Sequence, residues 1–130
     1  MGLHKLKFSV VPGNFAISRL AAGSAIPDWI HCGAFSCVAR SRDELSVVSL
    51  ASSIPPEVKS EKGWACLKLQ GPFPFQLTGI LASFLDPLAQ AGIPILAVST
   101  FDTDYILVKH EDQERTLTTL IEAGHELVGA

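Results

Sequence analysis

The sequence predicts a small α+β protein built from two related halves, residues 1–60 and 61–130. In the second half, segments with alternating apolar residues, as in strands, are interleaved with segments whose apolar residues follow the spacing of a helix face. The first half repeats this order in a fainter form. Of the 130 residues, 48% are apolar, including seven Phe and two Trp, so the chain has the side chains that a folded core needs.

The second half opens with a strand and a helix. In the segment 64–70, Ala65, Leu67 and Leu69 share one face, and this period of two predicts a half-buried strand. Residues 77–88 carry apolar side chains at helical spacing, which predicts an amphipathic helix. Those side chains are Leu77, Ile80, Leu81, Phe84, Leu85 and Leu88.

Proline and glycine delimit this helix. Pro87 lies inside the apolar pattern, so we expect the helix either to kink there or to restart with Asp86 as its N-cap. Gly92 and Pro94 end it.

A hairpin, a second helix and a last strand complete this half. Residues 95–101 and 105–109 are rich in strand-forming side chains and flank a polar turn at 102–104, which predicts an antiparallel hairpin. Asp112 opens the second helix, and residues 125–128 are long enough for a strand. The order β-α-β-β-α-β is the split βαβ arrangement called ferredoxin-like, with antiparallel strands and helices on one face.

The first half predicts related elements that are less regular. A strand over residues 6–10 should end at Pro12-Gly13. Residues 15–29 show no helical stripe and predict at most one turn, and the segment 55–57 is expected to open a short helix because proline suits the first helical position. We therefore interpret this half as a degenerate copy of the second.

A second hairpin supports the repeat. Residues 35–40 and 45–50 flank a polar turn, and a shift of sixty residues places Glu44 on Asp104. Two units of this size bury too little surface to stand alone, so we expect them to share an interface, joined by the polar segment 52–63.

Composition argues against several classes of function. The formal charge is −3 and the ten Lys and Arg are scattered, which speaks against a nucleic-acid partner. No apolar run reaches the roughly 18 residues of a membrane span, and no secretory apolar region follows Lys5 and Lys7. Three cysteines without framework spacing fit a reducing compartment. We expect a cytoplasmic protein that binds neither nucleic acid nor membrane.

The residues around His31 are the strongest candidates for a catalytic site, but their arrangement in the sequence gives little support for one. A thiol of Cys32 or Cys37 needs a base within hydrogen-bond reach, whereas sequence neighbours usually point apart. Two cysteines with one histidine lack a fourth zinc ligand. We expect incidental cysteines, no catalytic residue, no cofactor and no metal; the segment 110–112 is more simply a strand end and a helix cap. An enzyme that uses these thiols is the alternative.

Two polar features suggest a site for a small zwitterion. The hairpin turn gathers hydroxyls and the carboxylates of Asp102 and Asp104, which suit an ammonium, although such residues also serve turns through local hydrogen bonds. Thr78-Gly79 opens the first helix, where free backbone N–H groups and the helix dipole favour a carboxylate. A site that binds an anion next to a site that binds a cation suits the carboxylate and the ammonium of a free amino acid.

At these residues the sequence resembles the ACT domain. The resemblance rests on Gly79-Ile80-Leu81-Ala82, on the segment 87–93 and most specifically on Ser99 to Val108, and it covers about residues 64–128. It is closest to the branch that contains the animal arginine sensors called CASTOR proteins and their small bacterial relatives. The resemblance implies a regulatory module without catalytic activity that binds an amino acid, arginine or another small one, at an interface between domains.

The resemblance also implies a set of binding residues. The helix start would face the α-carboxylate, Thr100 and Phe101 would line the pocket, and Asp104 would receive an ammonium or guanidinium. The predicted ligand-binding residues are Thr78, Gly79, Ile80, Ser99, Thr100, Phe101, Asp102 and Asp104. The sequence departs from the family at Gln76-Leu77-Thr78, where many ACT domains carry an acidic or amide residue just before the glycine.

The arginine sensors hold four such units in one chain, so we expect a homodimer of this two-unit chain. The leading hypothesis is a regulatory amino-acid sensor. The alternatives are a protein–protein interaction module without a small ligand, and the regulatory subunit of an enzyme of amino-acid biosynthesis.

Overall fold

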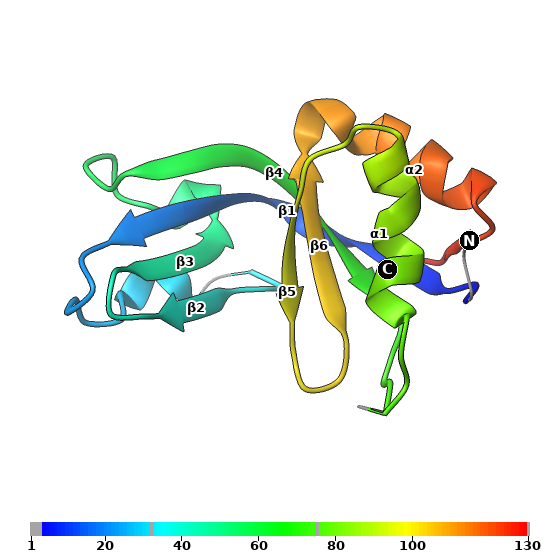
Figure 1. Ribbon diagram of the computed structural model, residues 1–130. Helices are drawn as coiled ribbons and strands as arrows, with labels where there is room; N and C mark the ends of the chain where they lie inside the picture. Colours follow the sequence, from blue (N-terminus) through cyan, green and yellow to red (C-terminus); the bar gives the residue numbers. More distant parts are fainter. Residues whose placement is uncertain (1–3, 32, 75, 130) are drawn as a thin grey trace. The chain divides into compact units, whose positions relative to one another are not determined.

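The computed structural model describes residues 4–31, 33–74 and 76–129 and shows an α+β fold (Figure 1). Most strand pairs are antiparallel, and the described residues form two α-helices. In chain order the elements are β1 (Lys7–Leu20), η1 (Asp28–Ile30), β2 (Cys37–Arg40), β3 (Leu45–Leu50), η2 (Ala51–Ser53), β4 (Ser60–Leu69), α1 (Ile80–Gln90), β5 (Ile95–Ser99), β6 (Asp104–Lys109), η3 (His110–Asp112), α2 (Gln113–Glu122) and β7 (Glu126–Leu127), where η marks a 3₁₀ turn.

The chain forms two compact units that are not consecutive halves. One unit contains Met1–Val11 and Ala65–Ala130, and the other contains Pro12–Trp64. The first eleven residues thus belong with the second half, whereas the sequence groups residues 1–60. The long strands β1 and β4 each contribute residues to both units. We call the first of these the helical unit and the second the strand unit.

The helical unit has the predicted elements with one addition to its sheet. Its strands lie in the order β7-β1-β4-β6-β5, and β7 pairs in parallel with β1 through Lys7↔Glu126 and Phe8↔Leu127. The six elements predicted from residues 61–130 therefore do not form the whole sheet of this unit, because β1, from the start of the chain, lies between β4 and β7. The hairpin of β5 and β6 is confirmed, with Ser99 opposite Asp104.

The core of the helical unit lies between the sheet and the two helices (Figure 1). Ala65, Leu67 and Leu69 are buried on one face of β4, as their spacing predicts. On the other face Lys68 is exposed, but Trp64 and Cys66 are buried, so the strand is half-buried only toward its end. The rings of Phe8 and Phe84 meet edge to face with centroids 5.3 Å apart. The other buried members of this core are Leu6, Ile80, Leu88, Ile93, Ile106, Val108 and Leu120.

Helix α1 continues through Pro87, so the predicted restart with Asp86 as N-cap is wrong. Proline has no N–H to donate to the carbonyl of Ser83, four residues earlier. The imidazole of His125 takes over this role, with Nε2 3.0 Å from the Ser83 oxygen. Its Nδ1 accepts the N–H of Leu6 at 3.1 Å, which assigns the ring proton to Nε2. A side chain distant in sequence thus completes the helix.

The same histidine predicts a pH dependence of stability. Burial lowers the pKa of the His125 imidazole, the hydrogen bond to Ser83 opposes this, and the charge of Lys5 lowers the pKa further. The unfolded chain, with a pKa of about 6.5, then binds the proton more readily than the folded chain. We expect the free energy of unfolding to fall as pH drops below about 6.5, until the lower folded pKa is passed.

Urea denaturation between pH 7.5 and 5 measures this effect. His125→Gln is the comparison, because a glutamine amide offers both a donor and an acceptor and does not titrate in this range. A parallel loss of stability in the variant and the natural chain would assign the effect to other groups.

The strand unit contains the order β2-β3-β1-β4. The prediction that the first strand ends at Pro12-Gly13 is wrong, because β1 continues to Leu20. The two residues instead mark a change of partner: β1 pairs with β7 before them and with β3 after them, from Phe15↔Leu50 to Leu20↔Leu45. Gly13 has a φ of +127°, which an L side chain rarely adopts.

The second predicted hairpin is confirmed, and the helices of a full repeat are not found. Strands β2 and β3 pair antiparallel from Cys37↔Val48 to Arg40↔Leu45. In the described part of the strand unit, the helical segments are the two short 3₁₀ turns η1 and η2, and the segment 55–57 does not open a helix. In its described residues, the strand unit therefore has the strands of the predicted repeat but not the α-helices of the repeat.

Among the described residues, none of the helices has the length and apolar character required to cross a membrane.

Candidate ligand-binding site

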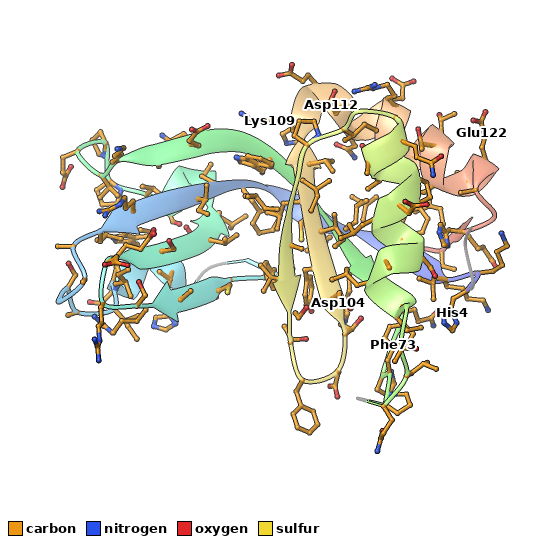
Figure 2. All side chains as sticks on the ribbon, viewed as in Figure 1. His4, Phe73, Asp104, Lys109, Asp112 and Glu122 are labelled. Carbon is orange, nitrogen blue, oxygen red and sulfur yellow. The ribbon has the colours of Figure 1, made fainter. Side chains whose placement is uncertain are left out.

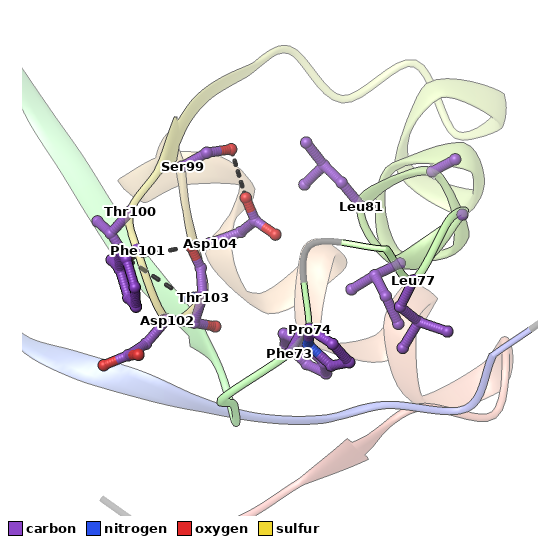
Figure 3. Close-up of a pocket in the computed structure, with 13 residues that line it drawn as sticks. Phe73, Pro74, Leu77, Leu81, Ser99, Thr100, Phe101, Asp102, Thr103 and Asp104 are labelled. Atoms are coloured by element: carbon purple, nitrogen blue, oxygen red, sulfur yellow. Dashed lines mark hydrogen bonds between the residues drawn. The ribbon is translucent and has the colours of Figure 1, made fainter.

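The helical unit contains a cavity of about 340 Å³ between the start of α1 and the tip of the β5–β6 hairpin (Figure 3). One wall is mostly apolar and comes from the loop after β4 and the first turn of α1. The other wall is polar and comes from the hairpin tip. The lining residues are Phe73, Pro74, Leu77, Gly79, Ile80, Leu81, Ala82, Ser99, Thr100, Phe101, Asp102, Thr103 and Asp104.

The hairpin tip is held by its own hydrogen bonds. The Thr100 N–H donates to the Thr103 carbonyl at 2.8 Å, and the Thr100 hydroxyl accepts the Thr103 N–H at 3.3 Å. The Ser99 hydroxyl donates to Oδ1 of Asp104. Thr100 and Thr103 thus make the local hydrogen bonds of the turn, a role that the sequence allows for all the polar residues of the tip. The Asp104 carboxylate extends toward Leu81 across the cavity (Figure 3).

The opposite side of the cavity is the start of α1. Gly79 precedes the helix with a φ of +80°, a conformation that favours glycine, and this is why the helix begins at Ile80 rather than at Leu77. The first intrahelical hydrogen bond of this turn runs from the Ser83 N–H to the Gly79 carbonyl at 2.9 Å. The N–H groups of Ile80, Leu81 and Ala82 have no acceptor within the helix, and the positive end of the helix dipole lies here.

Seven of the eight predicted binding residues line this one cavity. They are Gly79, Ile80, Ser99, Thr100, Phe101, Asp102 and Asp104. Thr78 does not line it, and its carbonyl instead accepts from Nε2 of His4, labelled in Figure 2, at 3.0 Å. That the predicted binding residues contact a ligand stays a prediction.

Sequence reasoning missed the apolar wall. Leu77 and Leu81 belong to the apolar stripe that predicts α1, and the predicted binding residues do not include them. Leu77 is 44% exposed and Leu81 is half-buried, because the helix begins after Leu77 and turns both side chains toward the cavity. Phe73 and Pro74 lie in a loop without periodicity, so no local pattern indicated them.

A family model described as an ACT domain matches residues 59–122. The chain contains an ACT domain. A second model, described as an N-terminal domain, matches residues 13–57. The cavity of this ACT domain protein lies within the region that the first model matches.

Solved structures resemble this ACT domain protein over nearly its whole length. Protein Atu0741 from Agobacterium tumefaciens is 44% identical, with a TM-score of 0.92, and the match covers 98% of this chain and 95% of that one. VC0802 from Vibrio cholerae, described as a possible transport protein of unknown function, is 20% identical with a TM-score of 0.74, over 92% and 91% of the two chains.

The ligand-free regulatory subunit of aspartate kinase from Thermus thermophilus is 12% identical with a TM-score of 0.58, over 85% of this chain and 93% of that one. At their low identities, VC0802 and this subunit show a shared fold alone. No curated protein sequence matches the chain.

The polar wall of the ACT domain cavity is fixed to the loop after β4. The buried Thr103 hydroxyl donates to the Leu69 carbonyl at 2.7 Å, and the Phe73 N–H donates to the Asp102 carbonyl at 3.0 Å. A Cβ on Gly71 would lie 2.6 Å from that same Asp102 oxygen, so only glycine allows this approach. The two walls are therefore positioned by backbone contacts before any ligand enters.

The two thiols that the structure describes, those of Cys37 and Cys66, are poorly suited to nucleophilic chemistry. Burial raises the pKa of the Cys37 thiol, and it raises the pKa of Cys66 to about 12, so both hold their protons at neutral pH. His31 is exposed, and Cys32 lies outside the described residues. Within the described ranges, no three His, Cys, Asp or Glu side chains come together as a metal site.

Proposed function

We propose that this ACT domain protein is a non-catalytic regulatory module that binds a free amino acid in the cavity between α1 and the β5–β6 hairpin. One observation carries the proposal: a single cavity has the first turn of α1, whose N–H groups have no acceptor within the helix, on one side and the Asp104 carboxylate on the other. The N–H groups and dipole suit an α-carboxylate, and Asp104 suits an α-ammonium. These are the two poles of an amino acid.

The known properties of the fold support a small-ligand regulatory role. The chain corresponds in length and fold to a separate regulatory subunit of aspartate kinase, a protein whose description names regulation rather than catalysis. It also belongs to a family in which small ligands are expected. We further propose a homodimer, which would place four ACT-like units together; a monomer by light scattering would contradict it.

Thermal denaturation in the presence of each common amino acid tests the function. A ligand present at a hundred times its Kd stabilises a folded protein by ~2.7 kcal/mol, which produces a clear rise in Tm for a chain of this length. We expect one chemical class of amino acid to raise the Tm in a saturable manner. The same measurement with the corresponding amino-acid amides, which lack the carboxylate, should show a much smaller rise.

A second candidate function is an interaction module without a small ligand. The Phe101 side chain at the hairpin tip is 80% exposed, and exposed aromatic side chains are common in protein interfaces. A flat response to every amino acid would favour this candidate over the sensor.

A further inference from the structure

We infer that the cavity selects an amino acid with a neutral apolar side chain, such as leucine, isoleucine or methionine, over arginine. The inference rests on the proposed function and narrows its ligand class. It departs from the arginine that the family resemblance suggests, and it comes from the composition of the two walls rather than from the position of the cavity.

The first argument is the apolar surface that the empty cavity leaves in contact with water. The core-facing side chains of α1, Phe84 and Leu88, are at most 1% exposed. Leu77, in contrast, is 44% exposed at the mouth of the cavity, and Leu81 is half-buried. Phe73 continues the same wall. Phe73 and Leu81 also pack in part against the core of the helical unit, so Leu77 is the most exposed of the three. A ligand side chain that covers this wall gains from the removal of apolar surface from water, which favours an aliphatic group.

The second argument is the number of charges available to a ligand. Among the residues that the structure describes, the charged lining residues are Asp102 and Asp104, and no lysine or arginine lines the cavity. Figure 3 shows the Asp104 carboxylate directed toward Leu81, whereas that of Asp102 points away from Leu77 and Leu81. The α-ammonium of any amino acid uses Asp104. A second cation on the ligand would then lie against the leucines without a partner, at a desolvation cost.

An acidic side chain is disfavoured for a related reason. It would lie in the same cavity as Asp104, with no cation in the lining to compensate it, and like charges repel. Glycine and alanine avoid these costs but leave the wall formed by Phe73, Leu77 and Leu81 uncovered. Amino acids with aliphatic side chains suit both walls, because the α-ammonium pairs with the polar wall and the side chain covers the apolar wall.

Calorimetric titration of the full chain with L-leucine, L-methionine, L-arginine, L-aspartate and glycine tests the selectivity. We expect leucine or methionine to bind at least tenfold more tightly than the other three. Tighter binding of arginine or aspartate would overturn the inference and leave the proposed amino-acid sensor intact. Absence of binding by all five, together with a flat Tm response to the remaining amino acids, would overturn both.

A pair of variants separates the wall from general effects. Leu77→Asn places an amide on the exposed part of the wall, and we expect it to weaken leucine binding about tenfold while the Tm of the free protein changes little. Ile121→Asn is the control, because Ile121 is 49% exposed on α2 and does not line the cavity. Equal affinities in the two variants would show that Leu77 does not select the ligand, and would overturn the inference.

Discussion

Replacing His125 by alanine is expected to lower the free energy of unfolding by about 2–4 kcal/mol. The imidazole is 4% exposed and joins two backbone groups from distant parts of the helical unit, the Leu6 N–H and the Ser83 carbonyl. Each buried group that loses its partner costs about 1–3 kcal/mol. The ring also packs against Phe84, with centroids 5.3 Å apart, and this contact disappears as well. Urea denaturation followed by circular dichroism measures the loss.

A double-mutant cycle with Pro87→Ala tests the reason for this loss. In the natural helix the Ser83 carbonyl depends on His125, because Pro87 has no N–H. An alanine at position 87 supplies the helical donor, so His125→Ala should cost about 1 kcal/mol less in the Pro87→Ala background than in the natural chain. The same cost in both backgrounds would show that the Ser83 carbonyl does not contribute to the role of His125.

Replacing Asp104 by asparagine is expected to abolish most of the response to the amino-acid ligand. Asparagine keeps the shape of the side chain and an oxygen that can accept the Ser99 hydroxyl, but it removes the charge that the α-ammonium requires. Hydrogen bonds to charged groups contribute about 1.5–3 kcal/mol, which corresponds to a Kd roughly 10- to 150-fold weaker. Titration of the ligand that raises the Tm of the natural chain measures this change, and the Tm without ligand serves as the check on folding.

Asp102→Asn is the matched control for this prediction. It removes the same charge two residues away, from a side chain that is exposed and points away from the apolar wall (Figure 3). We expect less than a threefold change in Kd, an order-of-magnitude value for a screened surface charge. If both variants weaken binding to the same degree, the general field of the acidic tip explains the effect, and a direct contact at Asp104 is ruled out.

Sequence periodicity was sufficient for the elements whose pattern reports one buried face. The alternation of Ala65, Leu67 and Leu69 predicted β4, and the turn at residues 102–104 predicted the hairpin. Local signals marked the start of α1 and the hairpin tip as two polar features, and the resemblance to the ACT domain implied the set of binding residues, of which seven line one cavity. Periodicity failed at Pro12-Gly13, because a change of strand partner within β1 involves the same residue types that usually end a strand.

The sequence by itself determined most strands and helices of the second half, the second hairpin and the residues that carry the charges of the site, since these depend on neighbours along the chain. Only the tertiary structure decided that β1 lies between β4 and β7, that His125 replaces the missing N–H of Pro87, and that Leu77 and Leu81 line a cavity, Leu81 while also packing against the core. The physical reason is that strand pairs, buried hydrogen bonds and cavity walls are formed by residues far apart in sequence. The spacing of residues along one element shows which of its faces is apolar, but not what that face contacts.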